Sequence, residues 1–188
     1  MVLALGVSAG AQASLTSSGP DTVYDSVQNL TWTKDANIAG VMDSFNVAPS
    51  WAFGLVVDGY SGWELPSIDQ LTTQFRTNLG EALGSSIADS HNASYNLFSN
   101  VQSGLYASSS FDFDCFCNRA GERPLDTEVD QWFFNTTNGS VEKNGGSYAY
   151  AWAVRPGNVA AVPVPGAFWL FGSALAGLMG LKRRGNIG

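Results

Sequence analysis

The stretch that decides the fold is GYSGWELPSIDQLTTQF, residues 59–75. Ile68, Leu71 and Phe75 recur in it at the spacing of one helix face, and Ser67 stands before them as a helix N-cap. The third residue after this serine is a glutamine, which completes a capping box. We therefore predict a helix that begins after Ser67 and packs its apolar face into a core.

Short strands and turns surround this helix. Turn formers between β-branched and aromatic residues predict a hairpin from residues 21–24 and 30–32. Residues 48–57 are mostly apolar and predict a short helix. Residues 131–135 and 148–154 predict two strands that pair around the turn segment TNGS. Antiparallel strands with one or two helices predict an α+β fold.

The composition predicts a single packed domain with an acidic surface. Of the 188 residues, 45% are hydrophobic and 13% are charged, a balance that argues against disorder. Three of the nine basic residues lie together near the C-terminus, so residues 1–165 hold six basic and sixteen acidic side chains, a net charge of −10. Because nucleic-acid binding needs clustered Lys and Arg, the charge excludes nucleic acid as a partner.

The N-terminal residues are typical of an export signal. Residues 2–13, VLALGVSAGAQA, are apolar and end with Ala11 and Ala13, small residues at the two positions that signal peptidase reads. We expect residues 1–13 to be a signal peptide, truncated at its start and cut after Ala13 by signal peptidase. The alternative is a buried apolar strand or helix.

The C-terminal residues predict a membrane anchor. Residues 159–181 carry no charge and are followed directly by Lys182, Arg183 and Arg184. Two prolines confine the expected helix to residues 166–181, and the side chain of Lys182 can lengthen the span by reaching the membrane surface. Basic residues after a span lie in the cytoplasm, so the acidic domain is expected outside it.

Residues 162–184, VPVPGAFWLFGSALAGLMGLKRR, resemble the PEP-CTERM class of bacterial sorting signals, in its variant with Val-Pro-x-Pro. Val162, Pro163, Val164 and Pro165 stand where the signature motif stands. The resemblance implies processing by an exosortase, a membrane cysteine protease that cuts near this motif, and then a place at the cell surface or outside the cell. The alternative is a tail anchor that stays uncut.

The segment between the two ends resembles the Lcl C-terminal domain family, bacterial extracytoplasmic modules related to C-type-lectin-like folds. The resemblance covers residues 23–159. It implies a C-type-lectin-like domain over residues 14–158, ahead of a sorting segment at 159–188. The acidic residues 111–130 depart from the family and look like an insertion. The stretches that carry the resemblance are VYD at 23–25, LTW at 30–32, GYSGWELP at 59–66, LFS at 97–99 and YAWAVRPG at 150–157.

The signature residues of these stretches are expected to be structural. Trp63 and Trp152 are of the kind that fills a core, and Pro66 of the kind that stands before a helix. Arg155 in an acidic chain is expected to form an internal ion pair with a carboxylate such as Asp25 or Asp35.

No catalytic residue is predicted. His91 is the single histidine, and it lies in the polar stretch SHNAS with no G-x-S-x-G motif and no cysteine nearby, so we expect it in a surface loop. Cys115 and Cys117 are too close for an unstrained disulfide and lack further ligands for zinc. We therefore expect neither an enzyme nor a metal site.

Residues 111–126 predict an acidic loop. Asp112, Asp114, Asn118, Glu122 and Asp126 offer oxygen ligands of the kind that calcium needs, but their spacing matches no EF-hand. We expect a solvated loop and no cofactor, with calcium as the alternative.

The same segment predicts the ligand-binding residues, if the domain resembles its family in use. Tyr106, Phe111 and Phe113 would stack on sugar faces, while Asp112 and Asp114 would accept hydrogen bonds from sugar hydroxyls. The expected ligand is an extracellular polysaccharide. The alternatives are an extracytoplasmic enzyme on a C-type-lectin-like fold and a purely structural matrix protein.

Overall fold

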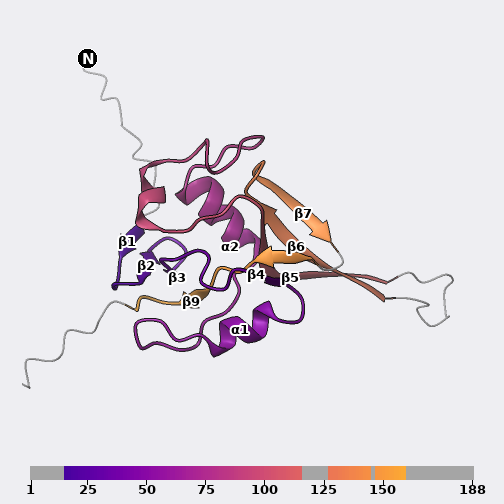
Figure 1. Ribbon diagram of the computed structural model, residues 1–188, viewed down its shortest axis with the longest axis horizontal. Coiled ribbons are helices and arrows are strands. Elements are labelled where there is room, and N and C mark those ends of the chain that lie inside the picture. The colour runs from indigo at the N-terminus through magenta and orange to yellow at the C-terminus, as the bar shows by residue number, and fades with distance from the viewer. Residues whose placement is uncertain (1–14, 116–126, 145–146, 160–188) are drawn as a thin grey trace, which may run out of the picture.

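The computed structural model describes residues 15–115, 127–144 and 147–159, which form two sheets and a set of short helices (Figure 1). The first sheet contains β1 (Leu15–Ser17), β2 (Thr22–Asp25), β3 (Leu30–Thr33) and β9 (Val154–Pro156), in the order β1-β2-β3-β9, with every pair antiparallel. The predicted hairpin is confirmed as β2 and β3. Asn29, with a φ of 52°, lies in the turn between them.

The second sheet contains β4 (Val41–Asp43), β8 (Tyr148–Tyr150), β5 (Leu105–Cys115), β6 (Thr127–Asn135) and β7 (Ser140–Asn144), in that spatial order. Only β5 and β8 pair in parallel. The predicted pairing of residues 131–135 with residues 148–154 is wrong. β6 pairs with β5 and, across the turn, with β7, because the polar stretch SVEKN forms an edge strand that its composition concealed.

The predicted helix after Ser67 is confirmed, together with its capping box. α2 (Ile68–Thr72) begins where the Ser67 hydroxyl accepts a hydrogen bond from the N–H of Gln70, at 3.2 Å, and the Ser67 N–H donates to the Gln70 side chain, at 2.7 Å. The helix continues as a π-helix, η1 (Thr73–Asn78), which brings Phe75 into the core. The predicted helix at 48–57 is α1 (Ala48–Gly54), and η2 (Ala93–Leu97) is a 3₁₀-helix.

Trp152 lies at the centre of the core and is fully buried. Its ring contacts those of Trp32 and Phe98, with centroids 5.0 Å apart in each pair, and its indole N–H donates to the carbonyl of Thr33 at 2.8 Å. Phe75 stacks on Phe134 at 4.8 Å and links α2 and η1 to the second sheet. Aromatic pairs of this kind add stability beyond the area that they bury.

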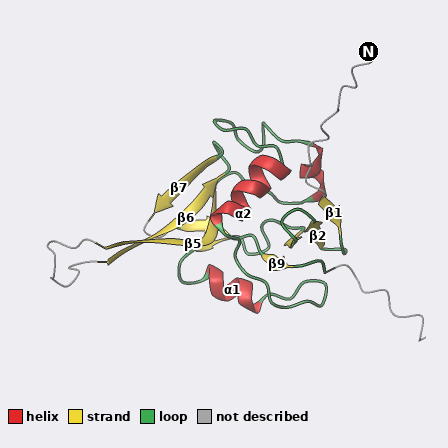
Figure 2. Cartoon of the chain, turned by 180° about the vertical axis from the view of Figure 1, so that it is seen from behind, coloured by secondary structure: helices red, strands yellow, loops and turns green. Residues whose placement is uncertain are grey.

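The two sequence stretches at 59–66 and 150–157 meet in space. Glu64 and Val154 exchange two backbone hydrogen bonds, of 2.8 and 2.9 Å. Trp63 is 1% exposed, and Pro66 is also buried, so the expectation that these residues and Trp152 are structural is confirmed. α1 lies beside β9 along the lower side of the molecule in both ribbon views (Figure 2).

The expected ion pair of Arg155 with Asp25 or Asp35 is wrong. Arg155 donates from Nε to the carbonyl of Ser61 at 2.8 Å and holds its guanidinium over the ring of Tyr60, 5.5 Å from the centroid. Alternation along β9 points Arg155 away from the core, while Val154 points into it. The two sheets and the short helices together confirm the predicted mixed α+β class for the described residues.

Candidate functional site

Residues 111–115, which were expected to lie in a loop, belong to β5 and pair with β6, and the two strands extend together beyond the rest of the second sheet (Figure 1). β5 and β6 pair from Leu105 opposite Asn135 to Cys115 opposite Thr127, with a register shift between Ala107 and Phe111. We call this extension the arm. The expectation of a loop is wrong for residues 111–115, because ladder hydrogen bonds to β6 fix their backbone.

Tyr106 cannot take part in ligand stacking, so this prediction is wrong. Its side chain is fully buried, its ring packs 5.1 Å from that of Phe75, and its hydroxyl accepts a hydrogen bond from the N–H of Gln102 at 2.8 Å. Burial raises the pKa of Tyr106 far above its usual value. Tyr106 lies before the register shift, where the sheet is covered by α2 and η1.

Phe111 lies after the register shift and is partly exposed. Its ring meets that of Phe45 edge to face, with centroids 5.4 Å apart. Phe45 comes from the turn that follows β4, so this contact fixes the base of the arm to the body of the domain. The contact with Phe45 therefore holds the Phe111 ring in place while part of that ring stays exposed.

The other face of the arm carries a group of four side chains, which we call the arm face: Asp112, Asp130, Trp132 and Lys143. Asp112 and Asp130 are cross-strand partners, and Trp132 is opposite Lys143. The Lys143 ammonium lies 2.6 Å from Asp112 and 3.9 Å from Asp130, and 5.3 Å from the centre of the Trp132 ring. The lysine thus balances part of the negative charge that a calcium ion would need.

Sequence reasoning missed Trp132 and Lys143. The alternation of Asp130, Trp132 and Phe134 places the first two on the same face as Asp112, a signal that could be read once the strand is known. Lys143 could be found from the sequence after β7 is placed in register with β6, because that register sets Lys143 opposite Trp132.

Phe113 and Asp114 lie on β5, where their backbones pair with Val129 and Glu128. Their side chains are outside the described residues, as are Cys117, Asn118, Glu122 and Asp126. Within the described residues, no group of three or more His, Cys, Asp or Glu side chains could hold a metal ion.

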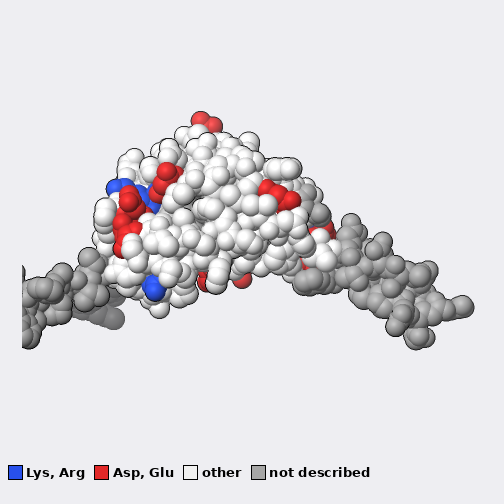
Figure 3. Space-filling view, turned by 60° about the horizontal axis from the view of Figure 1, so that its bottom comes forward, with Lys and Arg blue, Asp and Glu red and all other residues white. Residues whose placement is uncertain are grey.

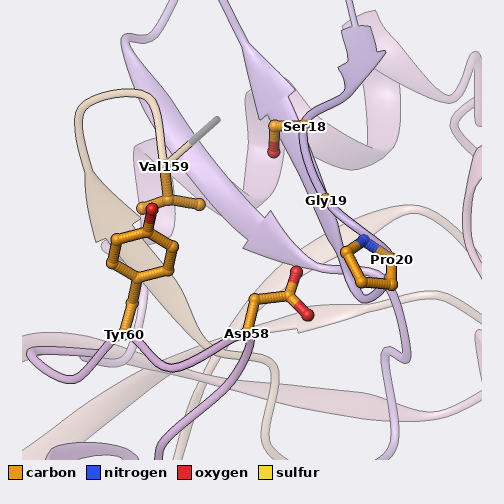
Figure 4. A pocket seen from close by; sticks show the side chains of 6 residues that line it. All are labelled: Ser18, Gly19, Pro20, Asp58, Tyr60 and Val159. Atoms are coloured by element: carbon orange, nitrogen blue, oxygen red, sulfur yellow. The ribbon is translucent and has the colours of Figure 1, made fainter. Parts of the chain in front are cut away.

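A small cavity of about 190 Å³ lies where the described chain ends (Figure 4). The Asp58 carboxylate at its edge accepts hydrogen bonds from the N–H of Asp21, at 3.2 Å, and from the hydroxyl of Thr22, at 3.0 Å. Asp58 therefore holds the turn between β1 and β2. The residues that line the cavity are Ser18, Gly19, Pro20, Asp58, Tyr60 and Val159.

A buried polar cluster next to the π-helix was also missed. Asp25 is fully buried, and its carboxylate accepts hydrogen bonds from the side chains of Asn78, at 2.7 Å, and Gln28, at 2.9 Å, and from the N–H groups of Val27 and Gln28. Neutral donors therefore replace the cation that was expected beside Asp25. This cluster stabilises the fold, and its donors leave Asp25 with a structural role.

His91 is exposed, as expected. Its Nδ1 lies 2.8 Å from the carbonyl of Ile87, and its ring stacks on Tyr95 with centroids 4.1 Å apart. Glu81 is a second titratable group outside the arm. It is 3% exposed, and burial raises its pKa to about 7 against the opposing charge of Arg76.

The chain matches no family model, no curated protein and no solved structure. None of the helices in residues 15–115, 127–144 and 147–159 is long and apolar enough to cross a membrane. The predicted signal peptide, the expected span at 166–181 and the Val162–Pro165 motif lie outside the described residues.

Proposed function

We propose that this chain is an exported envelope or extracellular-matrix protein that an exosortase processes, and that its domain binds rather than catalyses. In this proposal the leader at 1–13 directs export. The segment at 159–188 holds the protein in the membrane until the exosortase cuts near Val162–Pro165. We further propose that the domain is C-type-lectin-like, since its two most specific stretches, 59–66 and 150–157, are paired through Glu64 and Val154.

The observation that carries the proposal is the position of the domain between its two predicted cut sites. β1 begins at Leu15, two residues after Ala13, and Val159 is 2% exposed with its N–H directed to the hydroxyl of Thr31 at 3.3 Å. β1 and β9 both belong to the first sheet. Both cuts would therefore fall just outside a core whose strands they leave intact.

Intact-mass measurement of the protein from a host with an exosortase tests the processing. We expect a mature chain that starts at Ser14 and ends near residues 162–165, and a longer chain from a host that lacks the protease. Changing both Pro163→Ala and Pro165→Ala should prevent the second cut, because the motif is lost. Pro49→Ala, at an exposed proline of α1, is the matched control and should be cut normally. A C-terminus at Gly188 in the presence of the exosortase would refute the proposal.

The arm is our candidate for the ligand-binding surface. The arm face combines an indole ring, two carboxylates and an ammonium group, which together can stack on a sugar ring and hydrogen-bond its hydroxyls. The acidic domain repels polyanions, so we propose a neutral extracellular polysaccharide as the ligand. This site replaces Tyr106 with Trp132 and keeps Asp112, while Phe111 lies on the opposite face of the arm.

A glycan array probed with the full-length protein tests this part. We expect Trp132→Ala to reduce binding about tenfold or more, since an aromatic stacking contact is removed. Phe53→Ala, at a phenylalanine far along the chain from the arm, should leave binding unchanged. Binding that survives Trp132→Ala, Phe111→Ala and Asp112→Asn would exclude the arm as the site.

A further inference from the structure

Exposed apolar side chains lie on α1 and next to its two ends in the chain. Phe53 is 81% exposed, Val56 63% and Val47 48%. The opposite side of α1, Ala48 and Ala52, is buried against the domain. We call Val47, Phe53 and Val56 the α1 patch.

The sequence around the patch has no charged side chain that would favour exposure of the patch to water. Residues 44–57, SFNVAPSWAFGLVV, contain no charged side chain. The face on which α1 lies is broadly uncharged and carries its acidic and basic side chains toward the edges (Figure 3). Three further exposed apolar residues, Ile38, Val41 and Phe45, precede the patch in the chain. Exposed apolar patches often mark interaction sites.

The place where the chain leaves the domain indicates what covers the patch. The turn from Val57 to Tyr60, closed by backbone hydrogen bonds of 3.1 and 2.9 Å, follows the patch directly. Asp58 and Tyr60 in this turn line the same cavity as Val159, the last described residue (Figure 4). The α1 patch therefore lies next to the start of the C-terminal segment.

The length of that segment limits how far the patch can be from a bilayer. Residues 160–165 stand between Val159 and the apolar run at 166–181. Six extended residues span at most roughly 20 Å. A protein anchored by the apolar run thus keeps its α1 patch within reach of the membrane surface, and the tether gives even a weak contact a high effective concentration.

We infer that the α1 patch rests on the lipid bilayer while the protein is anchored, with Phe53 and Val56 among the acyl chains near the surface. The inference rests on the proposed membrane anchoring. Because the patch is uncharged and the domain is acidic, the contact needs no anionic lipid and is apolar in origin. Cutting near Val162–Pro165 removes the tether and so also releases this contact.

Photocrosslinking to lipid tests the inference. The full-length protein is placed in phosphatidylcholine vesicles that contain a phosphatidylcholine with a diazirine near the top of one acyl chain. After irradiation, lipid adducts are located by mass spectrometry. Trypsin cuts after Lys34 and Arg76, so a single peptide, residues 35–76, carries the patch.

We expect adducts on residues 47–56 in addition to those on 166–181. Phe53→Ser combined with Val56→Ser should lower the adducts on peptide 35–76 by about threefold or more, because two exposed apolar side chains are replaced by polar ones. Leu83→Ser, at an equally exposed apolar residue outside the patch, is the matched control and should leave them unchanged.

Three different results would contradict the inference, and each has a different meaning. Adducts on 166–181 with none on 35–76 would refute the inference and leave the anchoring in place. Absence of adducts on 166–181 would refute the anchoring, and the inference with it. Dimerisation of the full-length protein in detergent that Phe53→Ser with Val56→Ser abolishes would assign the patch to a second copy of this chain and also refute the inference.

Discussion

Glu81 shows how strongly one buried residue can couple this fold to pH. It follows the π-helix, and its N–H donates to the carbonyl of Phe75 at 2.9 Å, which turns its side chain toward the interior. Arg76, the nearest opposing charge, is directed to the carbonyl of Gly139, with hydrogen bonds of 3.1 and 2.6 Å from Nε and Nη2. The positive charge closest to the Glu81 carboxyl, that of Arg76, is therefore already hydrogen-bonded to another group.

We expect the folded protein to lose stability as the pH rises through about 7, where Glu81 ionises. The pKa of Glu81 is raised in the folded state above its unfolded value, so its contribution is fully present below the unfolded pKa and is lost at higher pH. Glu81→Gln should therefore stabilise the protein at pH 8.5, by about 1–3 kcal/mol, and have little effect at pH 4. Urea unfolding at the two pH values measures this.

Glu142 provides a control of opposite sign for this prediction. Hydrogen bonds from Asn135 and Ser140 lower the pKa of the Glu142 carboxyl. Glu142→Gln should therefore destabilise the protein at neutral pH, and the difference should vanish as the pH falls through that lowered pKa. Equal effects of Glu81→Gln at pH 4 and pH 8.5 would contradict our account of Glu81.

At the scale of the element, the start of α2 depends on the capping box at Ser67. Both reciprocal hydrogen bonds are present, and α2 then delivers Leu71 and Phe75 to the core. Ser67→Ala should lower the free energy of unfolding by about 1 kcal/mol, because an N–H at the helix start loses its partner. Ser50→Ala, on the exposed side of α1, should change it by less than about 0.5 kcal/mol. Chemical denaturation of both variants decides this, and equal losses would contradict the role of the cap.

Features that depend on residues close together in the sequence were predictable, and features that depend on long-range pairing were not. The cap at Ser67, the helix after it and the β2–β3 hairpin were predictable, because each depends on residues a few positions apart. The burial of Tyr106 was not, since it depends on a register shift before Phe111 that no local pattern encodes. β7 was missed because an edge strand needs little apolar character.

The candidate site was predictable in its location and less so in its members. The acidic and aromatic composition of residues 111–130 pointed to the arm, and Phe111 and Asp112 are part of it. Trp132 and Lys143 join them through pairing of β6 with β5 and β7, and such pairing is set by tertiary contacts rather than by sequence spacing. The same reason explains the failure at Arg155, whose partners come from the turn at Tyr60 and Ser61.

At the scale of the whole molecule, the described residues form a core that joins the first strands to the last. Its largest cluster contains side chains from Val23 in β2 to Val154 in β9. A chain shortened to residues 14–159 should therefore fold, with a thermal midpoint within about 3 °C of that of the full-length protein in detergent. Calorimetry of both chains measures this. Failure of the shortened chain to unfold cooperatively would mean that the ends contribute to the core.

The pairing of β9 with β3 has a consequence for the order of events during export. β9 and Trp152 come from the last part of the domain, yet β9 completes a sheet whose other strands lie between residues 15 and 33, and Trp152 fills the centre of the core. If the chain is exported from its N-terminus, as we propose, these two pieces arrive last. In that case the first sheet stays open on one edge until residue 156 has crossed, and final folding would coincide with the arrival of the C-terminal segment in the translocation channel.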